Sequence, residues 1–145
     1  MAKILVADND RVVLFTLAES LRKFGFDVIE TRDGLHAMHL CRTEAPDLVL
    51  LDVHLPGLDG LRIARRLREN MTIPFLFFSA DNDEVHIEEA RKIGAFGYMT
   101  KPINLVSIID VIQKALSCSQ ETSKLHRAIV QASEIPNPTV ALLAG

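Results

Sequence analysis

Short runs of apolar residues alternate along this chain with longer segments in which apolar residues recur at helical spacing. Five short runs predict strands that are buried on both faces, as in a parallel sheet, at residues 4–7, 28–31, 48–51, 75–78 and 96–99. The segments between and after them predict helices at about 11–24, 34–44, 60–69, 83–93 and from 104 to at least 116. This strict alternation indicates a doubly wound α/β fold, in which five helices flank a five-stranded parallel sheet.

Two of these helices carry patterns that predict which face turns toward the sheet. In the first helix, the apolar residues at helical spacing are Val12, Leu14, Phe15, Ala18 and Leu21. In the fifth helix, the stripe expected to cover the sheet consists of Leu105, Ile109, Ile112 and Leu116. Further apolar residues of that helix exceed what one packing face requires, namely Val106, Ile108 and Val111.

Residues suited to chemistry stand directly after four of the five strands. They are Asp8, Asn9 and Asp10 after the first strand, Asp52 after the third, Ser79 after the fourth, and Lys101 with Pro102 after the fifth. In a doubly wound sheet these strand ends lie at one edge. Carboxylates there can hold Mg²⁺ or act as a nucleophile, while a hydroxyl and an ammonium group can bind a phosphoryl group. A turn and a helix N-cap are the alternative for residues 8–10 taken alone.

Composition and charge narrow the functional classes. The 145 residues fit one domain with a short appendage, and the formal net charge of -3 argues against a general nucleic-acid or membrane surface. No stretch approaches the ~20 apolar residues of a membrane span. Cys41 and Cys118 lie far apart without metal-binding or redox spacing, which suits free thiols in a reducing compartment. We therefore expect a cytoplasmic protein that neither binds DNA nor inserts in a membrane.

Four motifs in register carry a resemblance to a known family. "KILVADND", "DLVLLDVHLPGLDG", "FLFFSA" and "GAFGYMTKP" resemble, in this order and spacing, the receiver domain of two-component response regulators. The resemblance covers about residues 2–117, so we expect a receiver domain at 1–117 and an extension at 118–145. It implies a flavodoxin-like sheet with strand order 2-1-3-4-5. It also implies a signalling domain, not an enzyme, that catalyses at most its own phosphorylation and dephosphorylation.

The resemblance implies a phosphoacceptor and a metal site. Asp52 would accept a phosphoryl group from a sensor histidine kinase or a phosphotransfer protein. Mg²⁺ (or Mn²⁺) would be held by Asp8, Asn9, Asp52 and the backbone carbonyl of His54, and Asp10 is a further candidate. The family usually has an acid where this chain has Asn9. Because an amide oxygen carries no charge, we expect weaker metal binding than in a site with two adjacent acids.

The resemblance also implies the residues of a conformational switch. Lys101 would pair with a phosphoryl oxygen, and in the resting state with Asp52. Ser79 would donate its hydroxyl to the phosphoryl group, and Tyr98 would turn toward the space that Ser79 leaves. Pro102 would follow a cis peptide bond. The surface made by the fourth helix, fifth strand and fifth helix would then bind a partner or form a homodimer.

Two alternatives stay open at this stage. In a pseudo-receiver, Asn9 would prevent phosphorylation and the domain would only bind partners. The start of the chain also fits the signature of haloacid-dehalogenase-type phosphatases, with Asp8 as nucleophile and Asp10 as general acid. Chain order argues against this class, because paired acids should follow the lysine and none stand on a strand after Lys101.

Other residues give weaker signals. The side chain of His54 neighbours the expected phosphoryl site, whereas His86 and His126 show no constellation with other ligand-type residues. Residues 118–145 could continue the fifth helix to about residue 133, or begin a truncated output segment. The closing "TVALLAG" is apolar without a period, so it either docks on the domain or precedes further chain.

Overall fold

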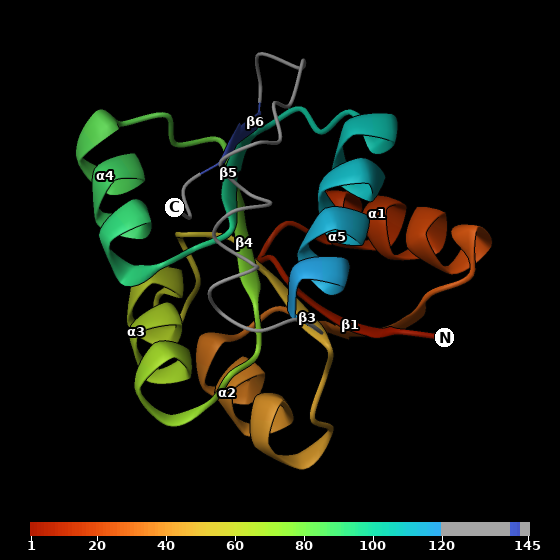
Figure 1. The fold of residues 1–145 in the computed structure, drawn as a ribbon, viewed down its shortest axis with the longest axis horizontal. Coiled ribbons are helices and arrows are strands. Elements are labelled where there is room, and N and C mark those ends of the chain that lie inside the picture. The colour runs from red at the N-terminus through yellow and green to blue at the C-terminus, as the bar shows by residue number, and fades with distance from the viewer. Residues whose placement is uncertain (120–139, 143–145) are drawn as a thin grey trace.

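The computed structural model describes residues 1–119 and 140–142, which form a sheet between two layers of helices (Figure 1). The strands are β1 (Lys3–Ala7), β2 (Asp27–Thr31), β3 (Leu48–Leu51), β4 (Phe75–Ser79), β5 (Gly97–Thr100) and β6 (Val140–Leu142). The helices are α1 (Arg11–Phe24), α2 (Gly34–Thr43), α3 (Gly60–Asn70), α4 (Glu84–Ile93) and α5 (Leu105–Ser119). The strict alternation of strand and helix is therefore confirmed.

The sheet has the expected strand order and one additional strand. Its order is β2-β1-β3-β4-β5-β6, and the first five strands run parallel. The prediction of five strands is incomplete, because β6 pairs antiparallel with the outer edge of β5. The end of the chain thus docks on the domain at residues 140–142. The predicted continuation of the fifth helix to about residue 133 lies outside the described residues.

Successive side chains along each strand point to opposite faces of the sheet and pack in two separate cores. In β3, Leu48 and Leu50 pack in the core under α1 and α5, while Val49 and Leu51 pack in the core under α2, α3 and α4. Figure 1 shows the same division, with α1 and α5 on one face of the sheet and the other three helices on the opposite face. All four of these β3 side chains are fully buried, as expected for a central parallel strand.

The inner face of α1 differs from the predicted one. Leu17 is buried together with Leu14, but Val12 and Phe15 are 73% and 64% exposed. The predicted pattern spanned more than one side of the helix. A packed face covers only part of the helix circumference, so the two residues at its margin turn outward.

The predicted stripe of α5 is also wrong in part. The side chains buried against the sheet are Ile108, Val111, Ile112, Ala115 and Cys118. Leu105 is 40% exposed and Val106 is 80% exposed, while Ile109 and Leu116 are only partly buried. Two overlapping stripes of this helix are apolar, and contact with the sheet selects one of them. Of the apolar residues assigned to a partner surface, only Val106 is exposed.

The ends of the helices are fixed by residues that the sequence makes recognisable. Asp10 and Asp59 accept hydrogen bonds from backbone N–H groups in the first turns of α1 and α3. Gly60 allows α3 to begin against β3, because a Cβ atom there would lie 2.1 Å from the carbonyl oxygen of Asp52. This close approach fixes the loop that follows Asp52.

Two further findings concern the class of the protein. Within residues 1–119 and 140–142, no helix is long and apolar enough to cross a membrane. Cys41 and Cys118 are both buried and form no disulfide. Burial raises the pKa of the Cys41 thiol to about 11, which keeps it protonated and unreactive near neutral pH.

Candidate functional site

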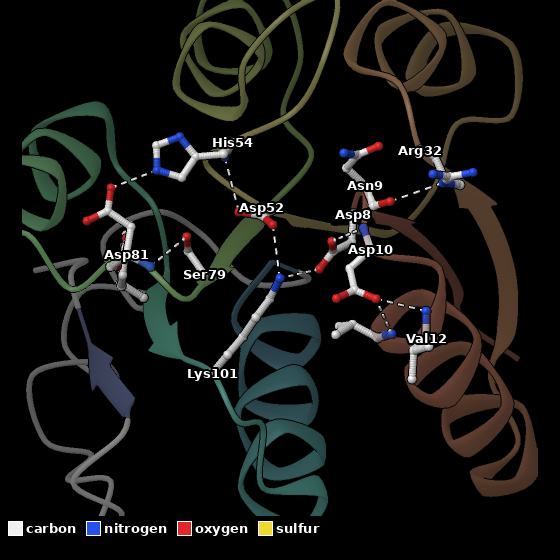
Figure 2. A network of polar contacts seen from close by, with 12 residues as sticks. Asp8, Asn9, Asp10, Val12, Arg32, Asp52, His54, Ser79, Asp81 and Lys101 are labelled. Carbon is white, nitrogen blue, oxygen red and sulfur yellow. Dashed lines mark hydrogen bonds and ion pairs between the residues drawn. The ribbon is translucent and has the colours of Figure 1, made fainter.

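The carboxyl ends of β1, β3, β4 and β5 bring the candidate residues to one edge of the sheet (Figure 2). Asp8 directly follows β1, Asp52 follows β3, Ser79 ends β4 and Lys101 follows β5. Because these four strands are consecutive neighbours in the sheet, the residues lie in a row. The end of β2, which the sequence marks as a plain turn, lies at one side of this row.

Lys101 connects the two buried carboxylates of the site. Its Nζ atom lies 2.5 Å from Oδ2 of Asp8 and 2.9 Å from Oδ2 of Asp52. The exposed fractions of these side chains are 16% for Lys101, 1% for Asp8 and 10% for Asp52. The ammonium group also lies 5.2 Å from the ring centre of Phe78, at cation–π distance. The predicted contact between Lys101 and Asp52 is thus present.

Charge in this cluster is unbalanced, with two carboxylates for one ammonium group. Burial raises the pKa of Asp8, and the nearby charge of Asp52 adds to the shift against the opposing effect of Lys101. Burial alone would lower the pKa of Lys101, but hydrogen bonds to Asp8 and Asp52 raise it. An ionised cluster therefore carries net negative charge and favours an additional cation.

Ser79 and Tyr98 are linked through the loop between β4 and α4. The backbone N–H of Asp81 donates to the Ser79 hydroxyl at 3.1 Å, and the Tyr98 hydroxyl donates to the Asp81 carbonyl oxygen at 2.5 Å. Ser79 and Tyr98 are each 1% exposed. Burial, followed by the negative charge of Asp81, raises the pKa of Tyr98 to about 12. One loop residue thus holds both residues of the predicted switch.

A comparison with known protein families decides the class of this site. The family model of the response regulator receiver domain matches residues 4–113. The chain belongs to this family. The family match and the parallel order of β1 to β5 confirm the resemblance that the four motifs carry. A receiver domain is a module of two-component signal transduction.

Similar proteins agree with the receiver assignment. Transcriptional regulatory protein PhoP of Bacillus subtilis is 34% identical over 138 residues, which cover 94% of this chain and 52% of that protein. Transcriptional regulatory protein PdtaR of Mycobacterium tuberculosis is 31% identical over 133 residues, covering 91% of this chain and 65% of that protein. The chain thus spans between about half and two thirds of the length of these relatives.

Solved structures show the same fold. The signal receiver domain of a modulated diguanylate cyclase from Desulfovibrio desulfuricans superposes with a TM-score of 0.77 at 26% identity. The superposition covers 83% of this chain and 97% of that domain. The flavodoxin-like receiver fold is therefore shown for this chain.

The oxygen atoms of the receiver site suit a hard divalent cation. Asp8 and Asp52 supply two buried carboxylates that already converge on one cationic group, and their charge exceeds that of Lys101. His54 lies two residues after Asp52 in the loop, and its backbone N–H donates to Oδ1 of Asp52 at 3.1 Å. Its backbone carbonyl is the further oxygen ligand implied by the family resemblance. These residues therefore fit Mg²⁺.

The two other residues predicted to hold the metal lie differently. Oδ1 of Asp10 accepts hydrogen bonds from the N–H groups of Val12 and Val13, so this carboxylate caps α1. The capping alternative is thus observed for Asp10, and its metal role stays a prediction. The side chain of Asn9 is exposed and points away from Lys101 in Figure 2. Its backbone carbonyl accepts a hydrogen bond from Arg32 at 3.1 Å.

Pro102 completes the receiver pattern after β5. The peptide bond between Lys101 and Pro102 is cis, as expected from the family resemblance. The backbone N–H of Lys101 donates to the carbonyl oxygen of Ser79 at 2.9 Å. The end of β5 is thus tied to the end of β4.

A second polar cluster corrects the interpretation of His86. His86 and His54 both contact Oδ2 of Asp81, at 2.8 Å in the case of Nε2 of His54. Their two rings lie edge to face, with ring centres 5.8 Å apart. The prediction that His86 has no constellation is therefore wrong, and Asp81 is a residue that the sequence reasoning missed. His126 lies outside the described residues.

The sequence contains a signal for one part of this cluster, the pair of His54 and Asp81. His54 stands two residues after Asp52, and Asp81 stands two residues after Ser79. Because β3 and β4 are neighbours in the sheet, the loops that follow the two strands lie side by side. His86 then reaches Asp81 from the first turns of α4, which Asp83 caps.

Proposed function

We propose that this chain is a phosphorylatable receiver whose acceptor is Asp52. The observation that carries the proposal is the contact of Lys101 with both Asp52 and Asp8 at the carboxyl edge of the sheet. The arrangement supplies a nucleophilic carboxylate, a buried cation beside it and a second carboxylate for a metal. The pseudo-receiver alternative lacks a specific observation in its favour, because the acceptor, the lysine and the hydroxyl residue all stand at the site.

The proposed reaction is a phosphoryl transfer between two proteins. A carboxylate oxygen of Asp52 attacks the phosphorus of a phosphohistidine, so an O–P bond forms as the P–N bond breaks. The electron pair of the P–N bond returns to the imidazole of the donor, which becomes neutral on proton uptake. Lys101 then pairs with a phosphoryl oxygen. Asp8, Asp52 and the His54 carbonyl would hold Mg²⁺, which would neutralise charge on the phosphoryl oxygens.

Release of Asp81 is the proposed first step of the switch. For Ser79 to donate its hydroxyl to a phosphoryl oxygen, the loop after β4 has to move with it. The same loop residue, Asp81, accepts the hydrogen bond of the Tyr98 hydroxyl. Tyr98 therefore loses its partner when Ser79 moves, which couples the two residues as alternative arrangements of one loop.

An apolar groove beside Lys101 is the proposed contact for side chains of the phosphodonor protein. The groove has a volume of about 310 Å³ and lies between α1 and the segment after β5, with Val13, Leu17, Lys101 and Ile103 among its lining residues. Lys101 thus lines the groove and binds the acceptor. Phe15 on α1 lies outside the lining of the groove, and its 64% exposed side chain would offer the donor protein a further apolar contact. The variant Phe15→Ala should slow transfer from a protein donor and leave labelling by acetyl phosphate unchanged.

The output surface is proposed to be the face of α4, β5 and α5. Val85 of α4 and Val106 of α5 are 68% and 80% exposed. The edge of β5 is paired with β6, and Tyr98 lies opposite Ala141 in the register. We propose that a change at Tyr98 loosens this pairing, so that a partner or a second copy of the chain can bind. Sedimentation of the beryllofluoride-treated protein tests this. The mass of wild type should increase on treatment and that of Val106→Glu should not, and an unchanged mass of wild type argues against a homodimer.

Labelling with acetyl phosphate tests the proposed function directly. The intact protein should gain the mass of one phosphoryl group when Mg²⁺ is present and none when the metal is chelated. Absence of any gain with Mg²⁺ would support the pseudo-receiver alternative. The haloacid-dehalogenase-type alternative has no support from the family match, and it would require the label on Asp8.

A further inference from the structure

The cluster of His54, Asp81 and His86 combines three side chains that bind transition metals. One ligand atom from each, two imidazole nitrogens and a carboxylate oxygen, lies within 4.8 Å of the other two. The residues come from three segments: the loop after β3, the loop after β4 and the helix α4. The fold thus brings together a set that is not visible as a sequence motif.

The donor set distinguishes this cluster from the proposed Mg²⁺ site. Two imidazoles and one carboxylate suit Zn²⁺ and neighbouring transition metals, whereas Mg²⁺ prefers oxygen donors. Three protein ligands leave one position of a tetrahedral ion for water, as in open zinc sites. The side chain of His54 would act here through its ring, whereas the Mg²⁺ site would use its backbone carbonyl.

The geometry already directs both rings at one oxygen atom. Nε2 of His54 and Nδ1 of His86 both contact Oδ2 of Asp81. Oδ1 of Asp81 is held separately, because it accepts the backbone N–H of Asp83 at 2.8 Å. An outer hydrogen bond of this kind orients a ligating carboxylate. On metal binding each imidazole would carry its proton on the ring nitrogen that faces away from Asp81. Small side-chain rotations would then bring the three bonds to the metal to about 2.0–2.2 Å.

We propose that His54, Asp81 and His86 form a binding site for Zn²⁺ or a similar divalent transition metal. Its partial exposure provides an entry path, since the side chains of His54, His86 and Asp81 are 65%, 31% and 16% exposed. The alternative is that the two imidazoles only form hydrogen bonds with Asp81 and bind no metal. Metal titration distinguishes a metal site from a hydrogen-bonded cluster without metal.

The position of the site gives the metal a regulatory effect. The backbone of Asp81 holds both Ser79 and Tyr98, and the backbone N–H of His54 holds Asp52. A metal that joins the rings of His54 and His86 to Asp81 stabilises this resting arrangement. By linkage, an ion that binds the resting arrangement more tightly disfavours the phosphorylated one. This consequence, unlike the metal binding itself, rests on the proposed phosphorylation of Asp52.

Titration of the untagged full chain with Co²⁺ and Zn²⁺, in the presence of excess Mg²⁺, tests the site. Wild type should bind one Co²⁺ with the visible absorption of a four-coordinate ion, and Zn²⁺ should displace it. His86→Ala should weaken binding roughly tenfold or more, because loss even of an outer partner costs that much. Asp81→Asn should weaken it similarly.

His39→Ala is the matched control, since His39 is an exposed histidine on α2. It should bind like wild type. Equal affinity of wild type and His86→Ala, or a loss in His39→Ala instead, would overturn the proposed site. These titrations are read without phosphorylation, so their result does not depend on the proposed function.

A second measurement tests the regulatory effect. At constant Mg²⁺, Zn²⁺ should slow the labelling of wild type by acetyl phosphate. His86→Ala should be labelled at the same rate with and without Zn²⁺. Equal slowing in both proteins would mean that Zn²⁺ acts at the Mg²⁺ site, which would overturn the regulatory role. Failure of all labelling would count against the proposed function and leave the metal titration standing.

Discussion

Two polar clusters at the same edge of the sheet balance their charge in opposite ways. In one, the ammonium group of Lys101 lies between the carboxylates of Asp8 and Asp52, with Asp8 only 1% exposed. In the other, the carboxylate of Asp81 lies between two imidazoles, and His54 is 65% exposed. The first cluster carries excess negative charge in a buried place, whereas the second is open to solvent at the ring of His54.

The difference explains why the two clusters suit different tasks. Buried charges are costly to leave unpaired, so the cluster around Lys101 has a defined geometry that changes only when another cation or a phosphoryl group enters. Partly exposed pairs add less to stability, so we expect that the contacts of Asp81 with the two histidines can break without unfolding the domain. The backbone of Asp81 connects the second cluster to Ser79 and Tyr98, which lie next to the first.

The largest expected effect comes from removing the cation of the buried cluster. Lys101→Met should lower the free energy of unfolding by about 2–3 kcal/mol, because it leaves two buried carboxylates facing each other. The matched control is Lys114→Met, which removes a lysine whose exposed pair with Asp110 is 3.3 Å long and which should lose at most about 1 kcal/mol. Urea denaturation measures both. Addition of Mg²⁺ should restore part of the stability of Lys101→Met only, and equal losses in the two variants would contradict the comparison.

The ionisation of Tyr98 tests the link between the clusters. It is the only tyrosine of the chain, so ultraviolet absorbance of tyrosinate reports on it alone. The pKa of Tyr98 in the folded protein should be about 12, raised by burial and then by the charge of Asp81. This value lies above the ordinary value of 10.0, so the protonated Tyr98 hydroxyl contributes to the free energy of unfolding. The contribution is complete below about pH 10 and is lost as the pH rises through about 12.

The variant Asp81→Asn serves as the comparison for this titration. It removes one of the charges that raise the pKa of Tyr98, so the pKa should move back toward its ordinary value. Titration of folded wild type near the ordinary value would mean that the Tyr98 hydroxyl is not held against Asp81.

A smaller effect is expected from a carboxylate at position 9, next to the buried cluster. Asn9→Asp should bind Mg²⁺ several-fold more tightly than wild type, because the number of ligand charges sets the affinity for a hard cation. Asn70→Asp at the end of α3 introduces the same charge away from the site and is the control. Equal Mg²⁺ titration curves for wild type and Asn9→Asp would show that position 9 does not contribute to the metal site.

The smallest effect is expected from the exposed cluster. His86→Ala should change the free energy of unfolding by less than about 1 kcal/mol in metal-free buffer, as is typical of partly exposed pairs. With Zn²⁺ present, wild type should gain stability and His86→Ala should not. A loss in metal-free buffer as large as that of Lys101→Met would remove the distinction between the two clusters.

The buried cluster could be predicted from the sequence because each member follows a strand. Apolar runs locate the strands, the alternation with helices makes them parallel, and the residues after them then lie at one edge. Asp8, Asp52 and Lys101 follow from this logic alone. The caps of α1 and α3 were equally readable, since an aspartate precedes each helix.

The remaining features depend on tertiary contacts that a local pattern does not contain. His86 is brought to His54 by the placement of α4, so no spacing in the sequence relates them. In α5, Leu105 and Ile108 belong to overlapping apolar stripes, and only contact with the sheet decides which is buried. The strand β6 is three residues long and pairs with β5 through the backbone, which leaves no period in its sequence.

Mapping the phosphorylated residue tests the central assignment most directly. Wild type, Asp52→Asn and His86→Ala are incubated with acetyl phosphate and Mg²⁺, reduced with borohydride to convert an aspartyl phosphate to homoserine, and digested for peptide mass spectrometry. Homoserine is expected at position 52 in wild type and His86→Ala, and no conversion is expected anywhere in Asp52→Asn. Homoserine at position 8, or undiminished labelling of Asp52→Asn, would contradict this assignment.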